Sequence, residues 1–158
     1  MTTDSGDAAR ILVVDDERVI REILAEFLSL EGFSVHTVED GEKALTELRL
    51  KPYDLLITDN NMPTLSGVEL VKKVRSARMT LPVILASGRL PTEELDRNPW
   101  LQLAATLIKP FSSGQLLETV RQVLLAADDA AGRAATFFPV PAAGMRQIAP
   151  ASQWGINE

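Results

Sequence analysis

Three aspartates follow apolar runs of the sequence and are of a type that can hold a divalent cation. Asp15 and Asp16 come directly after the run 11–14, and Asp59 ends the run 55–58. Short apolar runs with β-branched residues predict strands that are buried on both faces, as in a parallel sheet. Ligands of such sheets gather at the carboxyl ends of the strands. We therefore expect the three carboxylates to converge.

The three acids together need a cation. Carboxylates that lie close together repel one another, and this raises the pKa of one of them unless a positive charge lies among them. Hard oxygen ligands without His or Cys indicate Mg²⁺, which keeps several waters and takes one or two protein carboxylates plus a phosphate oxygen. The acids thus predict a site that places a phosphoryl group beside Mg²⁺.

Two further strand ends supply the complementary donors. The run 83–86 leads to Ser87, and the run 105–108 leads to Lys109. A transferred phosphoryl group carries its charge on its equatorial oxygens, so it needs a hydroxyl donor and an ammonium more than it needs covalent chemistry. Asp59 lies between the acid pair and these donors in chain order and is the predicted nucleophile.

In this combination the residues resemble the receiver domains of bacterial two-component response regulators, in particular the stand-alone, chemotaxis-regulator-like ones. The resemblance covers residues 10–126 and depends on the acid pair, the segment 59–63, the Ser87 hydroxyl and the segment 109–111, in that order. It implies a switch that a histidine kinase phosphorylates and that signals by changing the binding of a partner.

The resemblance also implies a role for each site residue. Asp59 would be the phospho-acceptor. Mg²⁺ would be held by Asp16, by Asp15 through water, and by the backbone carbonyl of Asn61. The Lys109–Pro110 bond would be cis, which directs the lysine inward.

Each of these residues also has an ordinary structural interpretation. The acid pair is often a solvated helix start, and Asp59 could form an Asx-turn before Pro63. Ser87 could belong to a plain loop, and Lys109 could be a surface cation. These interpretations do not explain why four strand ends carry such residues at once.

Two functions from other classes compete with the receiver. A phosphatase of the haloacid-dehalogenase-like group also uses an aspartyl nucleophile, Mg²⁺, Ser or Thr, and Lys. That group, however, places its nucleophile on the first strand with a second acid two residues later, whereas Asn61 follows Asp59 at that spacing. A flavodoxin-like nucleotide-binding domain would need a glycine-rich phosphate loop after the first strand, and none is present.

Helical patterns alternate with the strands and predict an α/β fold. We expect a doubly wound, five-stranded parallel sheet with the flavodoxin-like (βα)5 order, because crossovers between parallel strands are right-handed. Apolar residues at helical spacing over 19–28 end at Gly32, and Asp40–Gly41 opens a second helix. The pairs Ser66/Glu69 and Ser112/Gln115 predict capping boxes for two later helices.

His36 is the only histidine of the chain. It lies in the alternating segment 33–38, on the face opposite Val35, which indicates an exposed position on an edge strand. The phosphoryl donor histidine must therefore come from a partner, a sensor histidine kinase or a phosphotransfer protein of a phosphorelay.

The chain departs from the receiver pattern on its output side. Thr106 stands three residues before Lys109, where the family usually carries an aromatic residue that changes rotamer on phosphorylation. Between Pro91 and Pro99 there is room for only one or two helical turns, so the fourth helix should be short, bent or mobile. Trp100 could remodel the partner surface there, or it could fill the gap left by the shortened helix.

The composition and charge of the chain exclude several classes of protein and site. A net charge of −6 argues against nucleic-acid binding, and the lack of cysteine excludes disulfides and thiolate sites. The first nine residues are polar, no apolar stretch approaches the roughly 18 residues of a membrane span, and a cytoplasmic protein is expected. We predict a flexible N-terminus over 1–9, a receiver domain over 10–126 and a low-complexity tail over 127–158. Bulky apolar residues at 137–138 and 154–156 could dock on a partner or on the domain itself.

Overall fold

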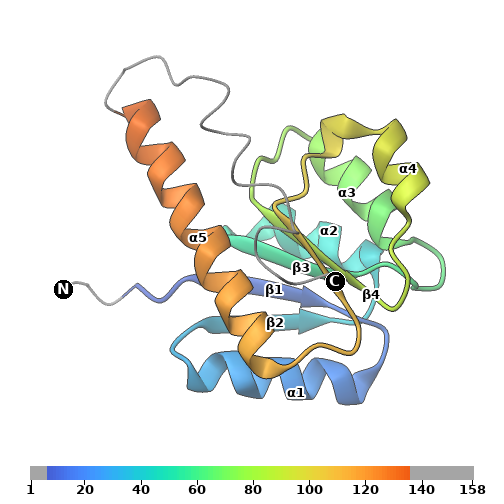
Figure 1. Cartoon of the computed structure of the whole chain (residues 1–158), viewed down its shortest axis with the longest axis horizontal. Helices are drawn as coiled ribbons and strands as arrows, with labels where there is room; N and C mark the ends of the chain where they lie inside the picture. Colours follow the sequence, from blue (N-terminus) through green and yellow to red (C-terminus); the bar gives the residue numbers. More distant parts are fainter. Residues whose placement is uncertain (1–6, 136–158) are drawn as a thin grey trace. The chain divides into compact units, whose positions relative to one another are not determined.

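Strands and helices alternate along the chain in the computed structural model, which describes residues 7–135. The strands are β1 (Arg10–Val14), β2 (Ser34–Val38), β3 (Leu55–Asp59), β4 (Val83–Ser87) and β5 (Ala105–Ile108). The helices are α1 (Arg18–Leu30), α2 (Gly41–Leu50), α3 (Gly67–Ser76), α4 (Thr92–Arg97) and α5 (Ser113–Ala135), and a 3-10 turn, η1 (Pro99–Leu101), follows α4 (Figure 1).

The strands are parallel and have the order β2-β1-β3-β4-β5. β1 pairs with both β2 and β3, and β4 pairs with β5. This confirms the predicted doubly wound, flavodoxin-like α/β fold. By compactness the chain divides into two units, Met1–Leu81 and Pro82–Glu158, and each is described by itself below.

The first unit is built around β1 and β3. From Ile11 to Val14 and throughout β3 every residue is buried, which explains their uninterrupted apolar runs. β2 is paired on one side with β1 and alternates between exposed and less exposed residues, as predicted for an edge strand. α1 packs against β1 and β2.

Local sequence signals set the helix ends of this unit. α1 is followed by Gly32, whose φ of 101° lies in the left-handed region, and Phe33 N–H donates to the carbonyl of Leu28. The Asp40 side chain accepts from Lys43 N–H at the start of α2. Ser66 and Glu69 form the predicted capping box of α3.

α2 and α3 are in contact, and the segment before α3 approaches α2 closely. A Cβ placed on Gly41 would lie 2.6 Å from Leu65 Cδ2 and 3.1 Å from Leu65 Cβ. The buried Leu65 side chain therefore occupies the space that any larger residue at position 41 would need. This contact fixes the beginning of α2 against the loop that follows β3.

His36 lies on the exposed face of β2, as predicted. Its side chain is 49% exposed, and its Nε2 lies 3.6 Å from Glu47 Oε2. The same carboxylate oxygen accepts from the Tyr53 hydroxyl at 2.7 Å and lies 3.2 Å from Lys51 Nζ. Burial and, secondly, this hydrogen bond raise the pKa of Tyr53 to about 12. His36 thus belongs to a surface cluster at the C-terminal end of α2.

The second unit contains β4, which is buried throughout, and β5, which alternates. The predicted capping box before α5 is present: Gln115 N–H donates to Ser112 Oγ at 3.0 Å, and Ser112 N–H donates to Gln115 Oε1 at 2.9 Å. α5 packs against β5 and is the long helix coloured orange in Figure 1.

Helix was not predicted for residues 127–135, which begin the predicted low-complexity tail over 127–158. These residues continue α5 to Ala135. Six of the ten residues 126–135 are alanines, at 126, 127, 130, 131, 134 and 135. Alanine has the highest intrinsic helix propensity, so a helix can continue here without an apolar stripe. The aromatic residues of the predicted tail, at 137–138 and 154, lie outside the described residues.

The segment after β4 has the predicted short helix. α4 has six residues and η1 three, with Pro99 at the start of the turn. Leu101 is 1% exposed and Trp100 is 47% exposed. The hypothesis that Trp100 fills the gap left by the short helix was therefore wrong, because Leu101 supplies the buried side chain. The Trp100 indole instead donates to Asn98 Oδ1 at 3.2 Å.

Candidate functional site

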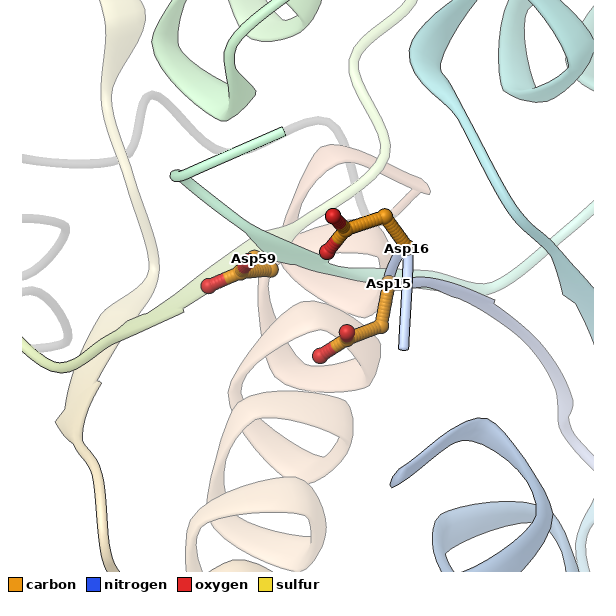
Figure 2. Close-up of side chains that lie close together, drawn as sticks. All are labelled: Asp15, Asp16 and Asp59. Atoms are coloured by element: carbon orange, nitrogen blue, oxygen red, sulfur yellow. The ribbon is translucent and has the colours of Figure 1, made fainter. Parts of the chain in front are cut away.

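Three aspartates meet at one edge of the first unit. β1 and β3 are paired so that Val14 lies opposite Thr58, and the next residues, Asp15 and Asp59, are therefore neighbours. With Asp16 they form a cluster in which one carboxylate oxygen of each residue lies within 4.8 Å of the others. Figure 2 shows the three side chains gathered there, two from the segment after β1 and one from the end of β3. The predicted convergence of the acids is confirmed.

The cluster combines burial with negative charge. Asp15 is 2% exposed and Asp59 is 7% exposed, whereas Asp16 is exposed. Bringing three carboxylates this close is unfavourable without a compensating positive charge. A set of carboxylate oxygens without nitrogen or sulfur suits a hard divalent cation such as Mg²⁺. The donor set therefore fits the predicted ion.

The main chain holds the buried aspartate of the pair in place. Asp15 N–H donates to the carbonyl of Val38 at 3.3 Å, which extends the β1–β2 pairing by one residue. Its Oδ1 accepts from Glu17 N–H at 2.9 Å. Arg21 donates to its main-chain oxygen at 2.7 Å. The acid pair therefore lies in a turn that is fixed before any ion binds.

The loop after Asp59 is fixed by Asn60. Its side-chain Oδ1 accepts from Val68 N–H at 3.0 Å, and its carbonyl accepts from Gly67 N–H at 3.0 Å. These bonds attach the end of β3 to the first turn of α3. Asn61, the predicted carbonyl ligand, lies exposed in this loop.

Ser87 and Lys109 end neighbouring strands of the second unit. Lys109 N–H donates to the carbonyl of Ser87 at 2.9 Å, so the two residues are adjacent across the sheet. Ser87 is fully buried; its hydroxyl donates to the carbonyl of Arg89 at 2.9 Å and accepts from Arg89 N–H at 3.2 Å. The Lys109–Pro110 bond is cis, as predicted. Thr106 is half-buried in β5.

Two residues near the acids escaped the prediction from sequence. Arg21 lies on α1 and donates to a main-chain oxygen of the acid pair, a contact that leaves no pattern in the sequence. Asn60 adjoins Asp59 and accepts from Val68 N–H, but the N-cap of α3 is Ser66, so no local capping signal marks this contact eight residues away.

Comparisons with known proteins agree with this geometry. A sequence model described as the response regulator receiver domain matches residues 11–121. The transcriptional regulatory protein CpxR of Escherichia coli (strain K12) is 40% identical over 117 residues, which are 73% of this chain and 49% of CpxR. The chain thus spans about half the length of this curated relative.

Two solved structures are similar over most of the chain. The chemotaxis response regulator CheY4 of Vibrio cholerae has a TM-score of 0.67 and 32% identity, and the match covers 74% of this chain and 99% of CheY4. The response regulator TrrA of Thermotoga maritima, solved in complex with Mg(2+)-BeF, has a TM-score of 0.65 and 36% identity over 73% of this chain and 98% of TrrA.

The sequence identities of these matches show more than a similar fold. The matches give no support to a haloacid-dehalogenase-like phosphatase. Receiver domains take phosphoryl groups from histidine kinases and act in phosphorylation-activated signalling. Among the helices of residues 7–135, none is long and apolar enough to cross a membrane. From the family match, the strand order and the acid cluster, we conclude that the chain belongs to the receiver-domain family of two-component response regulators.

Proposed function

We propose that Asp59 accepts the phosphoryl group from a phosphohistidine of a sensor kinase or a phosphotransfer protein. A carboxylate oxygen of Asp59 attacks phosphorus, a P–O bond forms, and the P–N bond breaks as the imidazole leaves. The observation that carries this proposal is the acid cluster, in which Asp59 ends β3 within 4.8 Å of Asp15 and Asp16. Such a cluster positions an acceptor beside a metal site.

Asp16, Asp15 through water, and the backbone carbonyl of Asn61 are proposed to hold Mg²⁺. The bound ion would neutralise charge on the phosphoryl oxygens. The exposure of Asp16 leaves its carboxylate accessible to an incoming ion, whereas Asp15 is already engaged by Glu17 N–H. This difference supports a direct role for Asp16 and an indirect one for Asp15.

Ser87 and Lys109 are proposed to bind the phosphoryl oxygens once transfer has occurred. The hydroxyl donates a hydrogen bond, and the ammonium neutralises a second oxygen. Their adjacency on β4 and β5, through Lys109 N–H and the Ser87 carbonyl, supports a shared role. The chain would catalyse only its own phosphorylation and dephosphorylation and would otherwise signal by binding a downstream protein, in the cytoplasm and without nucleic-acid contact.

The acceptor can be tested with a small donor. Incubation with acetyl phosphate and Mg²⁺ should add one phosphoryl group, detected by intact-protein mass spectrometry, and Asp59→Asn should abolish the addition. Asp96→Asn is a matched control, because Asp96 is an exposed aspartate on α4. Labelling that persists in Asp59→Asn, or that maps to His36, would contradict the assignment.

A further inference from the structure

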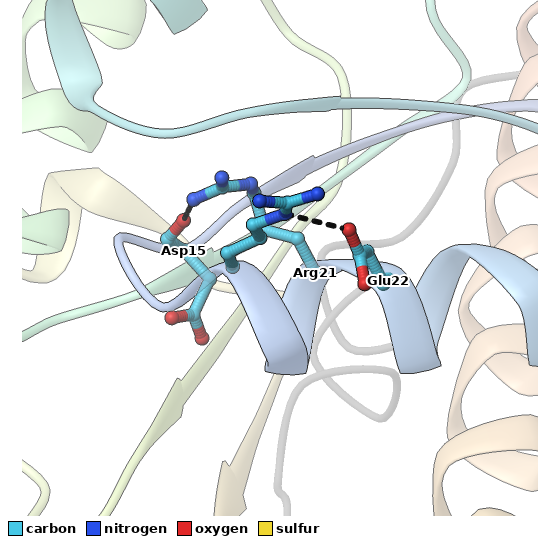
Figure 3. A network of polar contacts seen from close by, with 4 residues as sticks. Asp15, Arg21 and Glu22 are labelled. Atoms are coloured by element: carbon cyan, nitrogen blue, oxygen red, sulfur yellow. Dashed lines mark hydrogen bonds and ion pairs between the residues drawn. The ribbon is translucent and has the colours of Figure 1, made fainter.

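Arg21 makes a contact that the acceptor chemistry does not use. It is the fourth residue of α1 and is half-buried. One terminal nitrogen donates to the main-chain oxygen of Asp15 at 2.7 Å. Figure 3 shows the Arg21 side chain reaching back to this oxygen, while the carboxylate of Asp15 projects to the other side of the main chain. The guanidinium therefore holds the backbone and leaves the carboxylate to the acid cluster.

The oxygen that Arg21 binds belongs to the peptide unit that joins Asp15 to Asp16. Because a peptide unit is planar and rigid, fixing its oxygen fixes the direction in which the chain leads into Asp16. A charged donor makes this bond stronger than one between neutral groups. Asp16 itself is exposed, in contrast to the buried Asp15.

We propose that Arg21 is a positioning residue for Mg²⁺: it holds the peptide between the two acids in the orientation that lets Asp16 bind the ion. The inference rests on the proposed metal role of Asp16. Arg21 cannot be a ligand, since a guanidinium has no lone pair to offer. It acts on the ion through the main chain of Asp15.

Replacing Arg21 should change the affinity for Mg²⁺ in one direction if only its charge matters and in the opposite direction if it positions the turn. Removing a positive charge beside an acidic cluster should by charge alone tighten the binding of a cation. Losing the bond that orients the turn should weaken it, and loss of a group that orients a metal ligand typically costs about 10-fold to 100-fold in affinity. The direction of the change therefore separates the two explanations.

α1 offers a matched control. Arg18 begins the same helix, carries the same charge and is 80% exposed, and it forms a surface ion pair with Glu22 at 2.8 Å. Its replacement changes the net charge by the same amount without touching the turn of the acid pair. Figure 3 includes this Glu22 contact beside that of Arg21.

The test compares Arg21→Gln, Arg18→Gln and the unchanged full-length chain. Mg²⁺ is titrated calorimetrically without a phosphodonor, and the initial rate of phosphorylation by acetyl phosphate is then measured against Mg²⁺ concentration. We expect Arg21→Gln to raise the Kd for Mg²⁺ about 10-fold or more. Its rate at saturating Mg²⁺ should approach that of the unchanged chain, and Arg18→Gln should match the unchanged chain throughout. Should Arg21→Gln fail to fold, Arg21→Met keeps the aliphatic stem and carries the same expectation.

The outcomes distinguish this inference from the proposed function. If Mg²⁺ binds through Asp16 but Arg21→Gln binds it as tightly as Arg18→Gln, or more tightly, the positioning role is overturned. A reduced rate that saturating Mg²⁺ does not restore would also overturn it. If instead the unchanged chain and Asp16→Asn bind Mg²⁺ equally well, the metal role of Asp16 itself fails.

Discussion

Among single residues, Asp16 is the exposed member of the acid cluster and the one we expect to bind Mg²⁺ directly. Mg²⁺ should stabilise the folded chain by RT ln(1 + [Mg²⁺]/Kd), roughly 2.7 kcal/mol when free Mg²⁺ is 100 times its Kd. Asp16→Asn should erase most of that gain, measured as the rise in Tm with Mg²⁺. Glu17→Gln, at the next exposed acid, should keep it. Stabilisation that survives the double change Asp16→Asn and Asp59→Asn would place the ion elsewhere.

The residues of the site differ in how visible they are in the sequence. Asp15, Asp16 and Asp59 could be predicted to converge because parallel strands end at a common edge, and a strand end is marked by where an apolar run stops. Arg21 could not be predicted, because a long side chain that returns to a main-chain oxygen has no fixed spacing or partner type. Residues whose side chains act together at a site are therefore easier to predict from the sequence than residues whose side chains bind the main chain.

Between elements, the contact of α2 with the loop before α3 depends on the absence of a side chain at Gly41. Gly41→Ala should destabilise the fold by roughly 1–3 kcal/mol, because Leu65 must move from a packed position to admit the new Cβ. Urea unfolding checks this. Gly114→Ala is the control: its Cβ would meet nothing closer than 3.8 Å, so stability should stay the same or rise slightly. Equal stability of the two variants would show that Leu65 adapts freely.

The segment from α4 to η1 is the element that we expect to respond to phosphorylation. It is short, and Trp100 at its end is 47% exposed. Thr106 provides no ring to change rotamer, so the response should be larger between Ser87 and Trp100 than in β5. In a Trp154→Phe background, a beryllofluoride mimic should change Trp100 fluorescence. Amide shifts confined to Asp59, Ser87 and Lys109 would show that this segment is not a two-state element.

Helix ends were predicted well where a local signal sets them and poorly where none exists. Gly32, the Ser66/Glu69 capping box and the Ser112/Gln115 capping box each act within a few residues, and all are present. The end of α5 was placed too early, because an alanine-rich stretch forms helix by propensity without an apolar period. The roles of Trp100 and Leu101 could not be separated, since two adjacent apolar residues do not reveal which one faces the core.

For the whole molecule, the buried residues of the described part end at Val123. A chain shortened to residues 7–126 should therefore unfold cooperatively and be phosphorylated by acetyl phosphate at the rate of the full chain. Compared with a chain of residues 7–135, its circular dichroism should show the loss of the helical turns over 127–135. A marked fall in Tm would mean that residues beyond 126 take part in the fold, and that the predicted domain end is too early.

The Ser87 hydroxyl carries one proton, and in this structure the carbonyl of Arg89 receives it. If Ser87 donates to a phosphoryl oxygen, as we propose, that oxygen competes with the carbonyl of Arg89 for the same proton, and a single proton cannot satisfy both acceptors in full. The two bonds are therefore alternatives, so the phosphorylated state would leave the carbonyl of Arg89 without its donor just before α4. The loss of the bond that closes the loop between Ser87 and Arg89 would give the segment before this six-residue helix a reason to rearrange that does not depend on an aromatic rotamer.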